Sequence, residues 1–314
     1  MNDGAGNAPP SVSVLLPTHD RPDWLRAALE SVLAGDFGDF EVIVSNNGWP
    51  EHTRELRERV DDPRIRWVEQ PQGLGARENF LAALTLARGR YVAVLHDDDW
   101  WHHRLLANLI PPLDRHPEAV VAFADHWLVT TEGEIDAAAT DHTSRASGRA
   151  ALAAGLHQPF HRLAVQENLP ITGCAFRREA LPPKCFPPEV GNTLDVWAGY
   201  MLAVTGGAAY RCSERLLYYR LHEGNDFAGL EALRAAIYCQ QRMLADPRMT
   251  AHHDELRRRL ATRQRFMGTA LLRKGARARA RSHLRAALEL RPTLKGFGAW
   301  GASWFMPKRL LTRL

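Results

Sequence analysis

The sequence has few cysteines and no long hydrophobic run among its 314 residues. The four cysteines are scattered without a CxxC pair, so a zinc site is disfavoured and buried free thiols in a reducing cytoplasm are expected. No apolar run approaches the roughly 20 residues of a membrane-spanning helix. The start of the chain lacks the basic stretch and apolar core of a signal peptide, so we expect residues 1–10 to be a disordered lead-in.

Two common nucleotide-binding fingerprints are missing as well. The sequence contains no GxxxxGKS or GxxxxGKT motif, and Gly73 and Gly75 lack the third glycine of a dinucleotide-binding loop. Neither P-loop chemistry nor NAD binding is therefore supported.

The net charge of +4 is distributed unevenly along the chain. Residues 251–314 contain 16 Lys and Arg but 3 Asp and Glu, whereas residues 1–250 contain 24 against 33. A basic end on an acidic body predicts an anionic partner for that end: a membrane surface, a nucleic acid or the body itself.

Short apolar runs alternate with helical patterns over the first 130 residues. The runs predict strands near Ser13–Leu16, Glu41–Val44, Ile65–Val68 and Tyr91–Leu95. Apolar strands joined by helical crossovers predict a parallel sheet that is covered by helices on both faces. Sheets of this kind bind ligands at the carboxyl ends of their strands. Polar clusters follow three of these strands, at 17–20, 45–48 and 96–99, so we expect them to converge on one rim.

The rest of the chain has a mixed middle and a helical end. Strand patterns at 120–124, 174–176 and 216–219 are interspersed with helices, and from about residue 228 the pattern is helical and rich in arginine. The segment 269–292 is typical of two packed helices.

Three consecutive aspartates, Asp97–Asp99, stand directly after the fourth predicted strand. They fit a solvated loop with a helix cap, a site for Mg²⁺ or Mn²⁺, or general acid–base chemistry. The last is less attractive, because adjacent side chains rarely face the same reacting bond. A divalent cation would offset the repulsion of the carboxylates, and the end of a strand is where a nucleotide site is expected. We therefore favour the cation site.

Four further segments carry a recognisable pattern. They read SVSVLLPTHDRPDWLRAALESVLAGDFGDFEVIVSNNG, GLGARENFLAALTLARGRYVAVLHDDD, PITGCAFRREAL and LLYYRLHEGN. In this order they resemble the motifs of family 2 glycosyltransferases with the GT-A fold. The resemblance implies an α/β, Rossmann-like GT-A domain at 11–226, with a nucleotide-binding half at about 11–100 and an acceptor half at about 101–226. A helical basic region would follow at 227–314.

The resemblance also assigns roles around the acidic run. Asp99 would bind the metal and bridge it to the donor diphosphate, with Asp97 as a second ligand, while Asp97 or Asp98 would contact the ribose. The family often has Asp where this chain has His96, so the motif can also be aligned one residue earlier. The nucleotide pocket would be lined by Pro17, Thr18, Asp20, Asn46 and Arg77.

Asn46 departs from the family pattern, because members that use UDP-sugars commonly have Asp there. An amide still accepts a hydrogen bond from a nucleotide base, although without the help of a charge. UDP is therefore the expected donor nucleotide, with dTDP as the alternative. Asn46 also fits a simple turn residue before Gly48.

The general base is sought in the segment DVWAGYMLAVTG. An ungapped match to the family pattern puts Asp195 at the base and Gly206 at the closing glycine, whereas a rival register leaves Thr193 at the base. We prefer Asp195, because a threonine hydroxyl cannot take a proton near neutral pH. Asp195 also fits a first-turn helix residue favoured by the helix dipole.

Two further pairs of residues receive roles from the resemblance. Arg220 and His222 lie in a segment that would approach the diphosphate and close over it, although a structural role for the histidine is equally open. Trp100 and Trp101 are expected on the acceptor side, with core packing for one of the two.

The basic end suggests contact with an anionic membrane, and residues 296–314 fit this best because they mix aromatic, leucine and basic residues. A solvated helical pair is the plainer alternative, and no RNA-recognition motif favours nucleic acid. Together these features predict a cytoplasmic, inverting glycosyltransferase that depends on Mn²⁺ or Mg²⁺ and acts on a nucleotide sugar and a hydroxyl acceptor. The rivals are a nucleotidyltransferase, whose glycine-rich signature is absent from PTHDRP, and a non-catalytic nucleotide-sugar binding protein.

Overall fold

The computed structural model describes residues 8–222 and 229–305 and divides the chain into two compact units. The first, here called the α/β unit, contains residues up to Phe186 together with Ala198–Glu223. The second, the helical unit, contains Pro187–Trp197 and the chain from Gly224 onward. The boundary expected between residues 226 and 227 lies outside the described residues.

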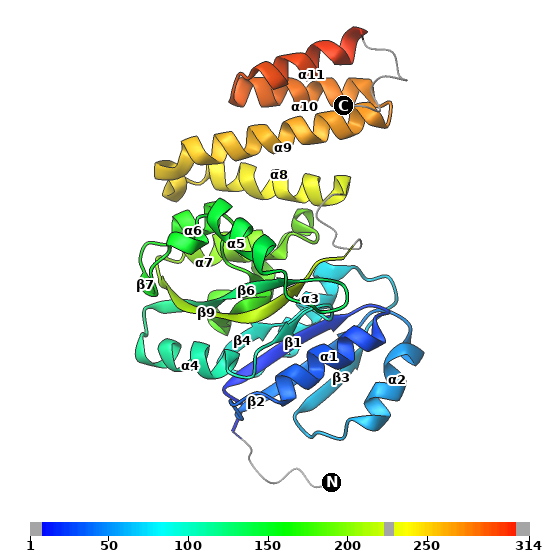
Figure 1. The fold of residues 1–314 in the computed structure, drawn as a ribbon, viewed down its shortest axis with the longest axis vertical. Coiled ribbons are helices and arrows are strands. Elements are labelled where there is room, and N and C mark those ends of the chain that lie inside the picture. Colours follow the sequence, from blue (N-terminus) through cyan, green and yellow to red (C-terminus); the bar gives the residue numbers. More distant parts are fainter. Residues whose placement is uncertain (1–7, 223–228, 306–314) are drawn as a thin grey trace. The chain divides into compact units, whose positions relative to one another are not determined.

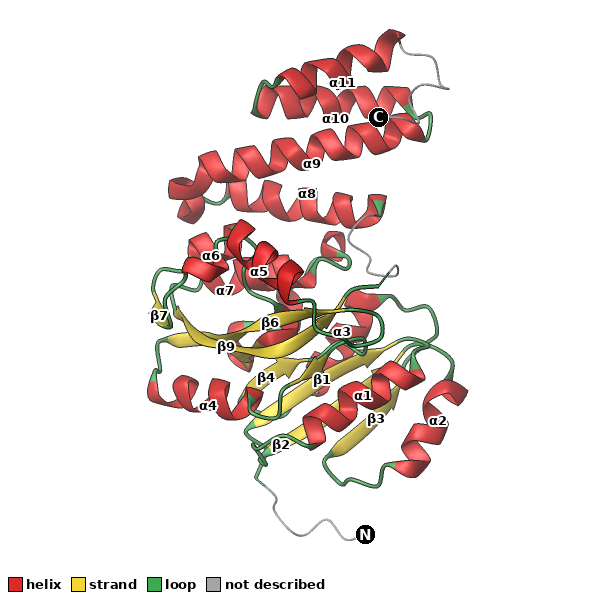
Figure 2. Ribbon diagram, in the orientation of Figure 1, coloured by secondary structure: helices red, strands yellow, loops and turns green. Residues whose placement is uncertain are grey.

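A nine-stranded mixed sheet forms the centre of the α/β unit, flanked by helices (Figures 1 and 2). Its strand order is β3-β2-β1-β4-β8-β6-β9-β5, with β7 paired to β9. The strands are β1 (Val12–Thr18), β2 (Phe40–Asn46), β3 (Ile65–Glu69), β4 (Tyr91–Val94), β5 (Trp100–Trp101), β6 (Ala119–Val129), β7 (Gly155–His157), β8 (Cys174–Arg177) and β9 (Ala208–Arg220).

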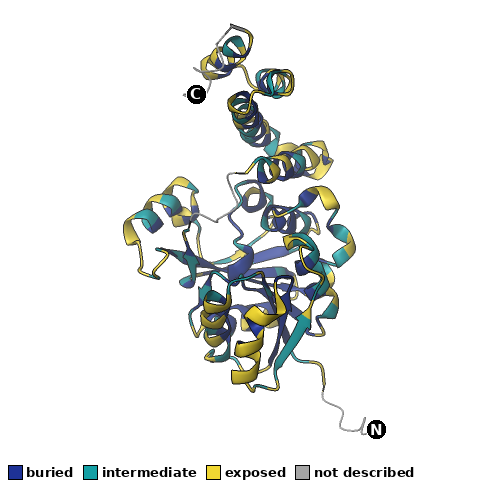
Figure 3. Ribbon diagram, turned by 90° about the vertical axis from the view of Figure 1, so that its right-hand side faces the viewer, coloured by how far each residue is buried: buried dark blue, intermediate teal, exposed yellow. Residues whose placement is uncertain are grey.

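The first four strands confirm the predicted parallel sheet. β1 pairs in parallel with β2 and with β4, and β2 pairs in parallel with β3. The crossovers are α1 (Pro22–Leu33), α2 (Pro50–Arg59) and α3 (Ala76–Leu86), and proline occupies the first turn of α1 and α2, where its missing N–H costs nothing. β1, β2 and β4 are almost entirely buried, which explains their continuous apolar runs (Figure 3).

The second half of the sheet is mixed in direction. β8 runs antiparallel to both β4 and β6, β9 runs parallel to β6, and the short β5 is antiparallel to β9. Helices α4 (Leu105–Arg115), α5 (Ala137–Ala146) and α6 (His161–Val165) belong to this half. β6 and β9 extend well beyond the short apolar runs that predicted them, and β5 and β7 carry no local signal of their own.

The helical unit contains α8 (Leu230–Ala245), α9 (His253–Arg273), α10 (Arg277–Leu290) and α11 (Leu294–Phe305). Its core includes Leu260, Leu271 and Leu284. Gly268 lets α9 and α10 approach closely, because a Cβ there would lie 2.6 Å from Leu284 Cγ. The end of α9 and α10 are the two packed helices expected at 269–292. Within the described ranges, no helix is both long and apolar enough to cross a membrane.

Candidate active site

The loops after β1, β2 and β4 meet at the carboxyl ends of these strands, as the polar clusters predicted. Thr18 stands opposite Asn46 in the β1–β2 register, so the two strands end level with each other. Thr18 Oγ1 donates a hydrogen bond of 2.8 Å to Asp97 Oδ2, which joins the loop after β4 to β1. The Trp49 backbone N–H donates a bond of 2.7 Å to Asp20 Oδ1, which joins the loops after β1 and β2. The three loops therefore form one polar rim.

Asp97 is buried and fully engaged by the loop after β1. Its Oδ2 accepts bonds from Thr18 Oγ1 and from the His19 N–H at 3.2 Å, and Arg21 Nη1 donates to its Oδ1 at 3.2 Å. Burial raises the pKa of Asp97, and the charge of Asp98 raises it further, against the opposing charge of Arg21. With both oxygens bonded, Asp97 helps to shape the rim.

Asp98 is less deeply buried and lies between two cationic or hydrogen-donating groups. Its Oδ2 accepts bonds from Arg21 Nη1 at 2.7 Å and from His222 Nε2 at 3.0 Å. Burial alone would raise the pKa of Asp98, but His96, His222 and Arg21 outweigh it, so the pKa lies below its usual value. Asp98 is thus the carboxylate of the run that most readily stays ionised.

Asp99 is 2% exposed, and only one of its oxygens is satisfied. Oδ1 accepts a bond of 2.9 Å from the Arg220 backbone N–H. Oδ2 is buried and has no hydrogen-bond partner among the residues that the structure describes. Burial and the charge of Asp98 raise the pKa of Asp99 well above its ordinary value, and the Arg220 N–H and the nearby Thr172 hydroxyl only partly oppose this. An unsatisfied buried carboxylate beside a second carboxylate is costly unless a cation completes it.

Donor atoms of His96, Asp98 and Asp99 all lie within 4.8 Å of one another. Two carboxylates and an imidazole are a donor set that suits a divalent cation, and one of the carboxylate oxygens, Asp99 Oδ2, is unbonded. Asp99, the first metal ligand proposed from the sequence, is in this group, whereas Asp97 is not. Sequence reasoning did not include His96 as a ligand, although its departure from the family pattern was a signal. We call Asp97, Asp98 and Asp99, together with Arg21 and Arg220, the rim cluster.

Two of the expected nucleotide-pocket residues shape the loops of the rim. Asn46 is buried, its Nδ2 donates to Glu69 Oε2 at 2.8 Å, and its Oδ1 accepts the Gly48 N–H at 3.0 Å. These bonds match the turn role that was the alternative for Asn46. The hydrogen bond from the Trp49 N–H lowers the pKa of Asp20, although burial acts in the opposite direction. Gly48 is required beside it, because a Cβ there would lie 2.3 Å from Asp20 Oδ1.

The other expected pocket residues lie on the same strands and on α3. Pro17 stands opposite Ser45 in the β1–β2 register. Arg77, in the first turn of α3, pairs with Glu78 Oε1 at 2.7 Å and donates to the Phe186 carbonyl. The guanidinium of Arg77 is therefore anchored within the α/β unit.

Arg220 and His222 reach the acidic run from the end of β9. Besides the backbone bond to Asp99, Arg220 Nε donates to the Asp98 carbonyl at 3.0 Å. The Arg220 guanidinium lies over the ring of Trp24 at 5.3 Å, and the Trp24 ring lies 4.7 Å from that of His222. The segment that was expected at the diphosphate is thus attached to the rim cluster.

The two tryptophans after the acidic run have different surroundings. Trp101 lies in the hydrophobic core, and its Nε1 donates to the Thr172 carbonyl at 2.6 Å. Trp100 is half-buried and stacks on Tyr218, with ring centroids 5.2 Å apart. Trp101 therefore has the core role expected for one of the pair, and Trp100 is the one with accessible surface.

Asp195 lies in the first turn of α7 (Leu194–Ala203), in the part of that helix that belongs to the helical unit. It is half-buried. The rival candidate Thr193 is buried, and its Oγ1 donates to the Val190 carbonyl at 2.7 Å, also within the helical unit. The hydroxyl of Thr193 is thus engaged at the start of the helix.

Comparison with known proteins shows which family part of the chain resembles. Residues 13–133 match the family model described as Glycosyl transferase family 2. A glucosyltransferase of Escherichia coli, UDP-Glc:alpha-D-GlcNAc-diphosphoundecaprenol beta-1,3-glucosyltransferase WfaP, is 28% identical over 32% of this chain and 39% of its own length. An uncharacterized glycosyltransferase of Nostoc, alr2836, is 28% identical over 68% of this chain and 66% of its own length. The chain thus spans less than two thirds of either relative.

Solved structures share the fold at low sequence identity. Staphylococcus aureus TarS 1–349 has a TM-score of 0.69 with 16% identity, covering 96% of this chain and 90% of that one. The mannosyltransferase PcManGT of Pyrobaculum calidifontis, in complex with GDP-Man and Mn²⁺, has a TM-score of 0.60 with 19% identity, covering 99% and 86%.

The fold and the rim define an α/β protein of the GT-A class with a helical C-terminal region. Over residues 13–133, the chain is similar to the family 2 glycosyltransferases, a class of transferase enzymes. The predicted fold class is confirmed, and the predicted family resemblance is supported over residues 13–133.

Proposed function

We propose that this protein transfers a sugar from a nucleoside diphosphate donor to a hydroxyl acceptor, with a divalent cation held by His96, Asp98 and Asp99. The observation that carries the proposal is the unbonded, buried Oδ2 of Asp99, beside Asp98 at the rim of a family 2 fold. The imidazole in the donor set favours Mn²⁺ over Mg²⁺, which prefers an all-oxygen shell.

Departure of the diphosphate is the first demand of the reaction, because negative charge grows on the leaving group. When bound at the rim, a divalent cation would supply Lewis-acid stabilisation of that charge. Arg21 and His222 hold Asp98 through hydrogen bonds of 2.7 and 3.0 Å, which fixes one carboxylate oxygen and leaves the other for a ligand. The backbone N–H of Arg220 likewise fixes Asp99 Oδ1 by a hydrogen bond.

Deprotonation of the acceptor is the second demand, and we assign it to Asp195. A carboxylate within reach of the acceptor hydroxyl would take its proton during attack on the anomeric carbon. Attack from the side opposite the diphosphate would invert the anomeric centre.

UDP-sugars are the favoured donors, with dTDP-sugars as the alternative. Support comes from TarS, which has been solved in complex with UDP-GlcNAc, and from the E. coli relative, whose name specifies UDP-Glc. Because the amide of Asn46 is engaged by Glu69 and Gly48, we expect other groups of the rim to read the base.

The most direct experiment is a thermal-shift and hydrolysis screen of UDP-, dTDP- and GDP-sugars, each with and without Mn²⁺. We expect a UDP-sugar to stabilise the protein and to be hydrolysed slowly, in both cases only with the metal. Binding of a nucleotide sugar without any turnover would instead favour a non-catalytic binding protein. Release of pyrophosphate from a nucleoside triphosphate and a sugar phosphate would favour a nucleotidyltransferase.

We also propose that the protein works in the cytoplasm, where α11 contacts an anionic membrane that carries the acceptor. Relatives from E. coli and Campylobacter jejuni carry diphosphoundecaprenol or PP-undecaprenol acceptors in their names, which supports a lipid-linked saccharide. Leu294 and Phe297 of α11 are 91% and 54% exposed. Part of the segment expected to bind membrane, residues 306–314, lies outside the described residues.

Replacement of both Leu294 and Phe297 by serine tests the membrane contact. Less apolar surface would enter the bilayer interface, so the variant should sediment less with vesicles that contain phosphatidylglycerol. The matched control is Leu156→Ser, which removes a side chain 40% exposed in the α/β unit. Equal sedimentation of both variants and the wild type would contradict the contact.

A further inference from the structure

Three aromatic side chains stand in one row across neighbouring strands. Trp100 of β5 lies opposite Tyr218 of β9, and Tyr218 lies opposite Trp127 of β6. Residues in register on paired strands point to the same face of a sheet. All three side chains are half-buried, so each retains accessible surface. The row therefore offers partly accessible aromatic side chains, of the kind that sugar rings contact.

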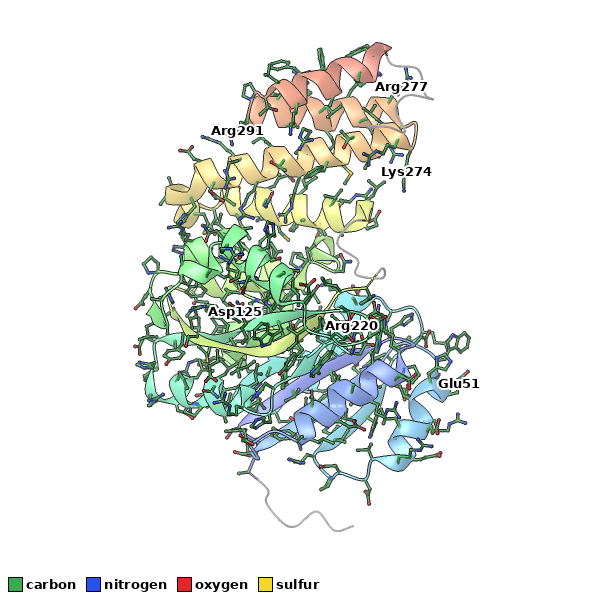
Figure 4. The ribbon with its side chains drawn as sticks, viewed as in Figure 1. Glu51, Asp125, Arg220, Lys274, Arg277 and Arg291 are labelled. Carbon is green, nitrogen blue, oxygen red and sulfur yellow. The ribbon has the colours of Figure 1, made fainter. Side chains whose placement is uncertain are left out.

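An arginine lies at each end of this aromatic row. The Arg220 guanidinium is 4.8 Å from the ring of Trp100, and its backbone N–H holds Asp99 of the rim cluster. The Arg215 guanidinium is 4.4 Å from the ring of Trp127. The row thus leads from the candidate donor site to a second charged region of the same unit. Figure 4 labels one residue of each region, Arg220 and Asp125.

A pocket of about 580 Å³ occupies the Arg215 end of the row. Trp127, Tyr218, Asp125, Arg211 and Arg215 are among the residues that line it. Among the described residues, Arg215 gives one side-chain hydrogen bond, of 2.7 Å, to Asp141 Oδ1, although a guanidinium has five N–H donors. Its side chain is 26% exposed, so a ligand can reach the remaining donors.

The charges around this pocket are unbalanced. In the described part of the chain, four guanidinium groups gather here against three carboxylates, one of them in an Arg104–Glu214 pair. We call this set the arginine pocket: Arg104, Arg149, Arg211 and Arg215 with Asp125, Asp141 and Glu214. Arg149 Nε lies 3.3 Å from Asp125 Oδ1, and Arg211 Nη2 lies 3.8 Å from Asp125 Oδ2. One buried carboxylate is therefore shared between two guanidinium groups, and neither contact is a close hydrogen bond.

His126 does not change this balance near neutral pH. Burial and the charge of Arg149 lower its pKa to about 4, against the effect of Asp125, so the imidazole is neutral. Burial, together with the charges of Arg211 and Arg215, also lowers the pKa of Arg149, which reports the same crowding of positive charge. An anionic ligand would relieve it.

We propose that the arginine pocket and the aromatic row bind a saccharide that carries an oxyanion, a carboxylate or a phosphate. The sugar contacts the accessible parts of Trp127, Tyr218 and Trp100, and the oxyanion lies against Arg215, whose planar guanidinium can bind it through two hydrogen bonds. The row ends at Arg220, so this saccharide is the acceptor; that assignment rests on the proposed function.

The test is an NMR titration of the protein with methyl β-glucuronide, glucose 6-phosphate and methyl β-glucoside. We expect at least one acidic sugar to bind at least tenfold more tightly than the neutral glucoside, and the two acidic probes separate a carboxylate from a phosphate ligand. Arg215→Met should remove this preference. Trp127→Leu should weaken all three sugars, because it removes an aromatic contact that acidic and neutral sugars share.

The matched control is Arg90→Met. Arg90 also pairs with an aspartate, Asp114 at 3.0 Å, and lies 5.0 Å from the ring of Tyr91, but it does not line the pocket. This variant should keep the preference for acidic sugars. Equal binding of acidic and neutral sugars to the wild type, survival of the preference in Arg215→Met, or unchanged binding in Trp127→Leu would overturn the proposal.

Calorimetry of UDP with Mn²⁺ on the same samples separates the two proposals. If UDP binds and the acidic sugars do not, the proposal that the arginine pocket binds a ligand is wrong and the proposed function stands. If the acidic sugars bind and UDP does not, the pocket stands and the proposed function fails.

Discussion

The rim cluster and the arginine pocket are opposites in charge. In the rim cluster, three carboxylates face the two guanidinium groups of Arg21 and Arg220. In the arginine pocket, four guanidinium groups face three carboxylates. Each set has a buried part, where an unbalanced charge is expensive: Asp97, Asp99 and Arg220 in the rim cluster, and Asp125, Arg149 and Arg211 in the arginine pocket. A protein tolerates such a cost most readily where a ligand of the opposite sign removes it. The comparison therefore predicts a cation at one end of the aromatic row and an anion at the other.

The largest effect is expected from Asp99→Asn, which removes one negative charge from the rim cluster. Asparagine can still accept the Arg220 N–H, so the loop should keep its shape while the cation loses a ligand. Mn²⁺-dependent hydrolysis of a UDP-sugar should fall about 10⁴-fold, equivalent to ~5 kcal/mol of transition-state stabilisation. Full activity would remove Asp99 from the metal site, and Arg90→Met again serves as the control.

A carboxylate outside both clusters should behave differently. Asp195→Asn is expected to lower transfer about 10²–10³-fold, as for loss of a general base, while UDP and Mn²⁺ still bind with unchanged affinity. Steady-state kinetics and calorimetry measure the two properties separately. If Thr193→Val abolishes transfer and Asp195→Asn does not, the rival register of this segment is correct.

A smaller effect, on stability, comes from Glu41, a buried carboxylate whose oxygens are both satisfied. Glu41 accepts bonds from Ser13 Oγ, from the Arg88 N–H and guanidinium, and from Arg66. Burial alone would raise the pKa of Glu41, but these bonds outweigh it and lower the pKa below the ordinary 4.5. A lowered folded-state pKa contributes stability above about pH 4.5 that is lost as the pH falls through the folded-state value.

Glu41→Gln should therefore lower the free energy of unfolding at pH 7 by about 1.5–3 kcal/mol. The difference from the wild type should shrink as the pH falls below about 4.5, which urea unfolding at several pH values would measure. Metal-free Asp99→Asn should change stability in the opposite direction, because it removes a buried charge with an unbonded oxygen. A loss of stability in both variants would contradict the contrast between a satisfied and an unsatisfied carboxylate.

The part of the site that depends on strand ends could be predicted from the sequence. Apolar runs followed by polar clusters predicted the parallel strands, and parallel strands bring their carboxyl ends together, so Thr18 and Asp97 were expected to lie close. They are hydrogen-bonded at 2.8 Å. The resemblance to family 2 glycosyltransferases, and with it the GT-A fold, followed from the order of the motifs.

Features set by long-range pairing could not be predicted in this way. The aromatic row depends on the register of β5 and β6 with β9, and register is fixed by tertiary packing and not by local pattern. The commitment of Asn46 to Glu69 depends on β3 lying beside β2. Likewise, the grouping of His96 with Asp98 and Asp99 depends on how the loop after β4 is held by Arg220 and His222.

Calorimetric titration of UDP, with and without Mn²⁺, into the wild type and Asp99→Asn tests the central claim most directly. The account predicts that Mn²⁺ tightens UDP binding at least tenfold in the wild type and has no such effect in Asp99→Asn. Equal UDP affinity with and without Mn²⁺ in the wild type, or an undiminished Mn²⁺ effect in Asp99→Asn, would contradict it.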